Sequence, residues 1–263
     1  MINVTGIMPP STFYRPSRSQ LNLWKSLDKA AIRRDEKLFL AEGGKVVSEL
    51  LRSTWKVQAL LVLEPKQARW QALLTGLADA VTVYGLTGPQ WNKLSQDTNP
   101  EGIMAVAEPP SGPDVSQLST GHIILAHRMN NPNNLGALIR TAHWFGFRSL
   151  LLSPDSVDFT NPKVVRTSMG SLFHLTIIPE VDLAGVIPSL KQSHLLVAGD
   201  VKKGVPPHPC PQPTALLLGS ESHGLPENIL ELADERWNIP GAGGAESLSL
   251  PQAAAIMMYA ATS

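Results

Sequence analysis

The chain has little cysteine, few aromatic residues and no excess of charge. Of its 263 residues one is cysteine and 6% are aromatic, and 22 Lys plus Arg balance 22 Asp plus Glu. The one thiol, Cys210, lies in a proline-rich segment, so an internal disulfide is excluded and nothing points to export. A net charge of zero argues neither for nor against a nucleic-acid partner.

Long apolar runs are missing too. No stretch approaches the roughly 18 to 20 apolar residues of a membrane span, and residues 1–10 lack the basic start and apolar centre of a secretory signal. With 43% hydrophobic residues the chain can nevertheless bury a substantial core. We therefore expect a soluble, cytoplasmic protein that does not engage a membrane.

Two common signatures of bound ligands are also lacking. The G-x-G-x-x-G spacing of dinucleotide-binding loops does not occur after the strand-like runs, and no lysine follows Gly224 as a P-loop would require. The seven histidines show no metal-ligand spacing, and the one cysteine adds none. We expect no metal.

The charge that is present is unevenly distributed. Residues 1–40 carry seven basic against three acidic side chains, a surplus of +4, whereas residues 219–263 carry one base, Arg236, against six acids, a balance of −5. A basic arm over residues 1–38 could follow the phosphates of RNA. An ordinary solvated helix face explains the same pattern equally well.

Hydrophobic periodicity predicts two α/β domains separated by the proline-rich residues 109–113. Residues 1–110 alternate amphipathic and apolar segments, as in a small α/β domain. In residues 115–263 short runs of Ile, Leu and Val alternate with helical segments, which predicts a buried parallel sheet with right-handed crossovers. These runs are 123–126, 149–152, 175–178, 195–198 and 215–218.

The C-terminal residues 251–263 are almost wholly apolar. A helix that is apolar all round must be buried, and one at the end of a chain is often buried against a second subunit. Burial in the core and burial in a dimer interface are equally compatible with this segment.

Three stretches place Gly, Asn or Ser directly after an apolar run. The first is Asn-Pro-Asn-Asn-Leu-Gly at residues 131–136 with Arg140 behind it, the second is residues 219–224, and the third runs from Ile239 to Ser249. In an α/β domain such loops bring backbone close to a ligand at the carboxyl edge of the sheet. Each alone is explained by a tight turn or a flexible loop, but their order and content together indicate one site.

The three stretches resemble, in order, the three motifs of the SpoU (TrmH-like) family of RNA ribose 2′-O-methyltransferases, in the SPOUT superfamily. Residues 161–170, 39–43 and 102–106 also look like segments of that family, so the resemblance covers most of residues 20–263. The matching motif positions are Asn134, Gly136 and Arg140, then Gly219, Glu221 and Gly224, and finally Ile239, Pro240, Ser247 and Leu248.

The resemblance implies an S-adenosylmethionine-binding α/β domain tied in a deep C-terminal trefoil knot, a homodimer formed through that domain, and a ribosomal-protein-like N-terminal domain that favours ribosomal RNA over transfer RNA. The residues that it implies for the cofactor are Leu218, Gly219, Ser220, Gly224, Ile239, Pro240, Ser247 and Leu248. Those that it implies for the reacting centre are Asn134, Arg140, Glu221, Ser247 and Ser249.

Arg140 is an unsuitable proton acceptor, because a guanidinium has a pKa above about 12. We expect it to stabilise the developing alkoxide or to clamp a phosphate, while the proton leaves through a neighbour or water. Glu221 is expected to orient a helix or the arginine.

The third motif departs from the family. Where the family usually continues Ser-Leu-Asn-Val, this chain has Ser249 in place of the asparagine, and Gly241 stands where methionine is common. Either activity is lost or altered, or Ser249 begins a helix as its N-cap, with Pro251 in the first turn and Gln252 completing a capping box. Gly241 should change the shape of the pocket more than its chemistry.

Two alternatives to ribose methylation remain at this point. A catalytically silent RNA-binding protein would keep the fold, and Ser249 together with the neutral net charge motivates that interpretation. Methylation of a base rather than a ribose is disfavoured by the first motif.

Overall fold

The computed structural model describes residues 13–77, 81–118 and 121–263. The chain forms two compact units, residues 1–110 and residues 111–263. The first twelve residues of the predicted basic arm lie outside the described part. Within that part, no helix is long and apolar enough to cross a membrane.

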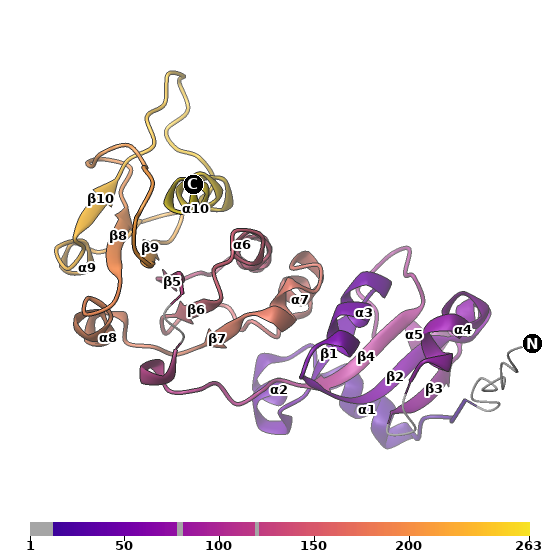
Figure 1. The fold of residues 1–263 in the computed structure, drawn as a ribbon. Coiled ribbons are helices and arrows are strands. Elements are labelled where there is room, and N and C mark those ends of the chain that lie inside the picture. Colours follow the sequence, from indigo (N-terminus) through magenta and orange to yellow (C-terminus); the bar gives the residue numbers. More distant parts are fainter. Residues whose placement is uncertain (1–12, 78–80, 119–120) are drawn as a thin grey trace, which may run out of the picture. The chain divides into compact units, whose positions relative to one another are not determined.

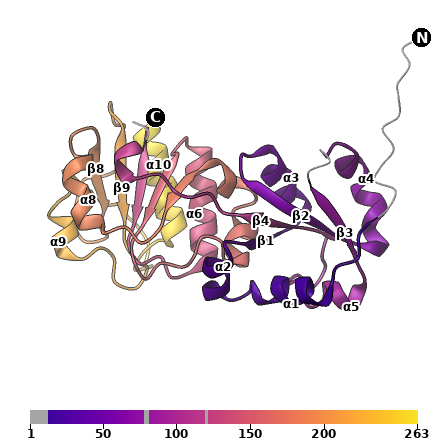
Figure 2. The same ribbon diagram turned by 90° about the horizontal axis from the view of Figure 1, so that it is seen from below.

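The first unit is built on a four-stranded sheet with helices on both faces (Figure 2). Its strands lie in the order β1-β4-β2-β3, with β2 parallel to β3 and β4 antiparallel to both β1 and β2. The strands are β1 (Phe39–Glu42), β2 (Lys56–Leu63), β3 (Thr82–Leu86) and β4 (Ile103–Glu108).

Helices α1, α2 and α5 lie on one side of this sheet, and α3 and α4 lie on the other (Figure 2). Apolar residues of α1 and α5, including Trp24 and Trp91, form one core with β2 and β4. The helices are α1 (Arg18–Ser26), α2 (Ala30–Glu36), α3 (Gly44–Arg52), η1 (Glu64–Lys66), α4 (Gln67–Thr75) and α5 (Gly88–Trp91).

One arginine of the predicted basic arm belongs to this core. The side chain of Arg33 is only 3% exposed. Its Nη1 donates hydrogen bonds of 2.9 Å to the carbonyl oxygens of Leu27 and Asp28, which fixes the turn between α1 and α2. Arg33 is therefore a structural residue and cannot contribute to a phosphate-binding surface.

The second unit contains a six-stranded sheet in which all neighbouring strands are parallel, in the order β10-β8-β9-β5-β6-β7. The five predicted runs are confirmed as strands, whereas β10 is additional. The strands are β5 (Ile123–Ala126), β6 (Ser149–Leu152), β7 (Thr176–Ile178), β8 (Leu195–Gly199), β9 (Thr214–Leu218) and β10 (Glu235–Trp237).

Helices α6, α7 and α10 lie on one side of the sheet, and α8 and α9 lie on the other (Figure 1). Helix α6 buries one apolar face, because Leu135, Leu138, Ile139 and Ala142 are buried while Arg140 is exposed. The helices are η2 (Val115–Gln117), α6 (Pro132–Trp144), α7 (Pro162–Thr167), η3 (Ser171–His174), α8 (Leu183–Leu190), α9 (Glu227–Leu230) and α10 (Leu250–Thr262).

Strand β10 is enclosed between two segments that precede it in the chain. On one side it pairs with β8. On the other side Val205, in the loop that joins β8 to β9, donates to the carbonyl of Arg236 and accepts from the N–H of Asn238, both at 2.9 Å. That loop therefore passes around the outer edge of β10. The trefoil knot implied by the resemblance requires a late segment enclosed in this way, and the knot itself stays a prediction.

Gly136 of the first motif has a packing role. A Cβ at this position would lie 2.6 Å from the Cβ of Thr167 and 2.9 Å from the carbonyl oxygen of Val164, both on α7. Such distances are far inside van der Waals contact. A residue without a side chain is thus what allows α6 to approach α7.

We predict that Gly136→Ala lowers the free energy of unfolding by about 1–3 kcal/mol, because overpacking forces α6 and α7 apart. Urea denaturation measures this change. Gly241→Ala is the matched control, since no atom lies within 4 Å of the added Cβ there. Equal stability of the two variants would show that the α6–α7 contact is not as tight as described.

Candidate functional site

The three motifs meet at one edge of the parallel sheet of the second unit. Strands β10, β8, β9 and β5 are consecutive neighbours, and because they are parallel their carboxyl ends lie at the same edge. The third motif follows β10, the second follows β9, and the first follows β5. Ligands of open α/β sheets bind outside this edge, so the predicted convergence of the motifs is present in the fold.

The second motif is a tight turn that only glycine can begin. A Cβ on Gly219 would lie 2.1 Å from the carbonyl carbon of Gly224 and 2.3 Å from the N–H nitrogen of Leu225. The turn is closed by a hydrogen bond of 2.9 Å from the Gly224 N–H to the Ser220 carbonyl, and Gly224 has φ +66°. Both glycines are therefore required by the backbone, and the turn exposes Glu221 to solvent.

His127 lies directly beside this turn and was not predicted as a site residue. It follows β5, and its N–H donates to the carbonyl oxygen of Leu218 at 2.8 Å. Its Nδ1 is buried and has no hydrogen-bond partner among the described residues. Burial, and secondly the charge of Arg128, lower the pKa of His127, so the ring is neutral at pH 7. A buried polar atom without a partner is costly and fits a site that a ligand completes.

A polar cluster joins the ends of β8 and β10. The Asp200 N–H donates to the Trp237 carbonyl at 2.9 Å, and the Asn238 side chain donates to the Asp200 carbonyl at 3.1 Å. Arg236 forms ion pairs with Asp200 at 3.6 Å and with Glu227 of α9 at 2.9 Å. The cluster fixes the start of the third motif. The sequence analysis did not predict this cluster. The one feature of the sequence that could have indicated it is that Arg236 is the only basic residue among the acidic residues 219–263.

The third motif is an exposed loop of small residues. Pro240, Ser247 and Leu248 are exposed, and Ile239 is half-buried. Within residues 239–248, which the structure describes throughout, no backbone N–H donates a hydrogen bond to another backbone group. Apart from the adjoining residues, no atom lies within 4 Å of a Cβ added at Gly241, Gly243 or Gly244. These accessible backbone groups fit the adenosyl group that the resemblance implies.

Ser249 begins α10, as predicted for a helix cap. It has extended backbone angles of φ −60° and ψ 150°, and Pro251 lies in the first turn. The side-chain oxygen of Gln252 accepts hydrogen bonds from the Ser249 hydroxyl at 3.0 Å and from its N–H at 3.4 Å. The expected capping box is thus present, and Ser249 has a structural role that does not depend on catalysis.

The first motif places its two polar residues on different sides of α6. Asn134 is half-buried in the first turn, which Asn131 caps by accepting a hydrogen bond of 2.9 Å from the Asn133 N–H. Arg140 is exposed. In the described part of the chain neither Arg140 nor Glu221 forms an ion pair or a hydrogen bond. The expected orientation of Arg140 by Glu221 stays a prediction.

Comparison with known proteins agrees with this geometry. Residues 121–259 match the model of the SpoU rRNA Methylase family, and residues 19–105 match the MRM3-like substrate binding domain. The fold and the matches define a two-domain α/β methylase.

Full-length relatives give the same result. The chain is 30% identical over 240 residues to the 23S rRNA (guanosine(2553)-2′-O)-methyltransferase RlmP of Bacillus subtilis, covering 90% of this chain and 93% of that protein. It is 27% identical over 235 residues to a 23S rRNA (uridine(2479)-2′-O)-methyltransferase of Streptomyces viridochromogenes, covering 85% and 82%. The crystal structure of the SpoU methyltransferase AviRb from Streptomyces viridochromogenes, in complex with the cofactor AdoMet, has a TM-score of 0.81 at 26% identity and covers 94% of this chain and 97% of that one. The chain belongs to the SpoU rRNA methylase family, as the motifs predicted.

We predict that Ser249→Ala lowers the free energy of unfolding by about 0.5–2 kcal/mol, because it removes a hydroxyl from the start of α10. Ser247→Ala, two residues earlier in the exposed loop, should leave stability unchanged. Urea denaturation of both variants tests the difference. If Ser249→Ala is as stable as the parent protein, helix capping does not account for the presence of serine at position 249.

Proposed function

We propose that the chain is an S-adenosylmethionine-dependent methyltransferase that methylates a ribose 2′-hydroxyl of ribosomal RNA. The observation that carries the proposal is the convergence of the three SpoU motifs at one edge of the parallel sheet. The substrate-binding unit then presents the RNA. With ribosomal RNA as the substrate, we place the protein in the cytoplasm.

The named targets of the relatives support ribose rather than base methylation. One relative is named for a guanosine and another for a uridine, and both names specify the 2′-oxygen. A purine and a pyrimidine share their ribose but not their base edges. If one site in this family acts on both nucleotides, the group that it methylates is the ribose that they share. We propose that this chain also methylates the ribose.

The cofactor is proposed to lie between the second and third motifs. Backbone groups of Leu218, Gly219, Ser220 and Gly224 would form one wall, and those of Ile239, Pro240, Ser247 and Leu248 the other. When bound, S-adenosylmethionine supplies a methyl group on a cationic sulfur. The described residues contain no group of three or more His, Cys, Asp or Glu side chains that could hold a metal ion, and we propose no metal.

The reacting centre is proposed to lie beside Asn134, Arg140 and Glu221. Methyl transfer to a hydroxyl oxygen displaces the sulfur in line while the hydroxyl proton leaves. Arg140 would stabilise the negative charge that develops on the oxygen, and Glu221 would orient the arginine. The proton would pass to a neighbouring group or to water, because the guanidinium is already protonated.

We further propose that the second unit forms a homodimer through α6 and α10. Trp144 at the end of α6 is 83% exposed and Tyr259 on α10 is 64% exposed, with Ile256 one turn before it. The ring of Phe145 lies 6.2 Å from that of Tyr259, so the end of α6 meets the exposed side of α10 at this pair. Large exposed apolar patches mark interfaces. Arg140 lies one turn from Trp144, so the partner would approach the reacting centre.

Methyl transfer should depend on Arg140. We predict that Arg140→Ala lowers transfer of labelled methyl groups to bulk ribosomal RNA at least 100-fold, the scale on which loss of one stabilising donor slows a reaction. Calorimetry should find the affinity for S-adenosylmethionine unchanged within about threefold. Wild-type transfer by the variant would contradict the assigned role, and tight cofactor binding by the parent protein without transfer to any RNA would favour the silent RNA-binding protein.

Dimerisation should depend on the exposed face of α10. We predict that the double variant Ile256→Asp, Tyr259→Asp sediments as a monomer while the parent protein is a dimer, since buried charge opposes association. Met257, on the same helix, is not a suitable site for the charge. It is only 4% exposed and packs against Gly199, where an added Cβ would lie 3.2 Å from the Met257 methyl carbon, so an aspartate there would disturb the core as well. Val201→Asp, at an exposed residue of the β8–β9 loop, is the control. A dimer that survives the double change must use another surface.

A further inference from the structure

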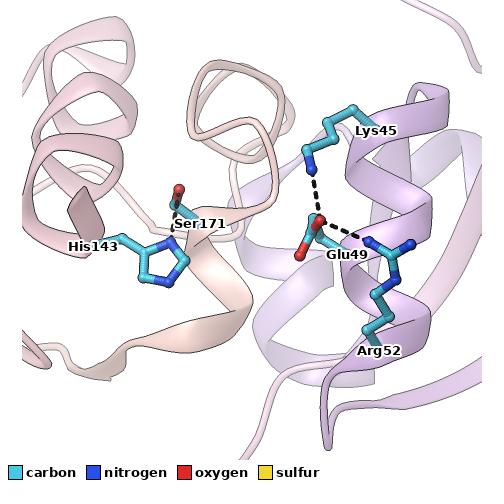
Figure 3. Close-up of polar contacts among 5 residues, drawn as sticks. All are labelled: Lys45, Glu49, Arg52, His143 and Ser171. Carbon is cyan, nitrogen blue, oxygen red and sulfur yellow. Dashed lines mark hydrogen bonds and ion pairs between the residues drawn. The ribbon is translucent and has the colours of Figure 1, made fainter. Parts of the chain in front are cut away.

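The basic side chains of the first unit fall into two groups. On α3, α4 and β2 they are paired with carboxylates. Lys45 and Arg52 both bind Glu49, at 2.6 Å and 3.2 Å (Figure 3). Lys56 binds Glu108 at 2.7 Å, and Arg69 binds Glu101 at 2.9 Å. Partners of this kind neutralise much of the field that would otherwise attract a polyanion.

The basic residues of α1 and the turn after it are not paired. Arg18, Lys25 and Lys29 are exposed, and none forms an ion pair or a side-chain hydrogen bond with a residue that the structure describes. Helix α1 contains no acidic residue. Arg18 and Lys25 are two turns apart on the same face, about 10 Å along the axis. Two cations without a counter-charge therefore lie along this helix, and a third, Lys29, follows its end beside the exposed Asp28.

Neighbouring cations do not belong to this row. Arg15 is held by Glu64. Arg34 and Lys37 are exposed on either side of two exposed acids, Asp35 and Glu36, which offset their charge. Among the described residues of the first unit, the exposed cations without an adjacent or bound acid are thus Arg18 and Lys25 on α1 and Lys93 after α5, and Lys29 stands beside Asp28.

An exposed aromatic side chain lies beside the same helix. Tyr14 is 65% exposed, although its backbone is fixed to β3 by hydrogen bonds of 3.0 Å to Val83 and from Gly85. Its ring centre lies 6.2 Å from that of Tyr84, which in turn packs edge-on against Trp24 of α1 at 5.3 Å. An exposed aromatic ring on a fixed backbone, four residues before Arg18 in the chain, combines with the cations of α1 in the way that binds unpaired nucleotides.

We propose that Tyr14 and the α1 row (Arg18, Lys25 and Lys29) form a binding surface for a single-stranded segment of the RNA substrate. The cations contact successive phosphates, and an unstacked base packs on the Tyr14 ring. This proposal rests on the proposed function and adds to it the class of RNA that the first unit recognises. An anionic membrane is the weaker candidate, because the exposed residues of α1 are all polar (Arg18, Ser19, Asn22 and Lys25) and offer no apolar face for insertion.

The test uses the full chain and a labelled, unstructured 20-nucleotide RNA. The triple variant Arg18→Gln, Lys25→Gln, Lys29→Gln should bind this RNA at least tenfold more weakly at 0.1 M salt. The slope of log affinity against log salt should become less steep by about 2, since each contact to a single strand contributes about 0.7. The control replaces three paired cations, Lys45→Gln, Lys56→Gln, Arg69→Gln, and should change affinity less than threefold.

Tyr14 separates stacking from charge. Tyr14→Ala should weaken binding of the single strand about 5- to 100-fold at all salt concentrations, whereas Tyr14→Phe should bind like the parent protein, because stacking uses the ring and not the hydroxyl. Neither change should weaken binding of the same RNA annealed to its complement by more than about twofold. Thermal unfolding of each variant shows whether it is folded.

The other outcomes separate failure of this surface from failure of the proposed function. Equal losses in the two triple variants would mean that charge acts without a defined surface. Unchanged RNA affinity, with reduced binding to phosphatidylserine vesicles, would assign α1 to a membrane. If the parent protein transfers methyl groups and the α1 variant keeps full RNA affinity, this proposal fails alone. If the predicted RNA losses occur but the parent protein methylates no RNA, the surface stands and the proposed function fails.

Discussion

The parallel pairing of β9 between β8 and β5 is the constraint on which the site depends. It puts the loops after four adjacent strands at one edge. At that edge the backbone at Gly219 approaches the backbone at Gly224 so closely that no side chain fits between them. The sheet thus brings distant segments of the chain to one edge, and glycine allows the second motif to form a tight turn there. Arg140 and Glu221 contribute exposed charge around this edge.

The polar groups around this edge divide into structural residues and residues open to a ligand. Asp200, Arg236 and Asn238 are paired with one another and hold the ends of β8 and β10. Ser249 is engaged in the start of α10. Arg140 and Glu221, by contrast, have no partner in the described part of the chain. The residues that are fixed without a ligand hold the strand ends and α10 in place, and the exposed ones are those that we propose to act on RNA and cofactor.

Much of this fold followed from the sequence because burial dictates it. The five apolar runs of the second unit are strands because both faces of a parallel sheet are covered, so Ile, Leu and Val recur without interruption. Strand β10 escaped prediction because it has three residues, two of them charged, and is held by backbone bonds to β8 and Val205 rather than by an apolar pattern. Arg33 was counted as surface charge, since its burial depends on carbonyl groups that no sequence pattern reveals.

The site was predictable to a similar extent. The motif order located the loops, and helix-capping chemistry explained Ser249. The packing role of Gly136 and the buried Nδ1 of His127 follow only from three-dimensional contacts. The central claim is that the converging loops serve transfer of a methyl group to a ribose. The direct measurement is to methylate ribosomal RNA with labelled S-adenosylmethionine, digest it to nucleosides and identify the labelled product. We predict a 2′-O-methylated nucleoside. A label found on a base would contradict it.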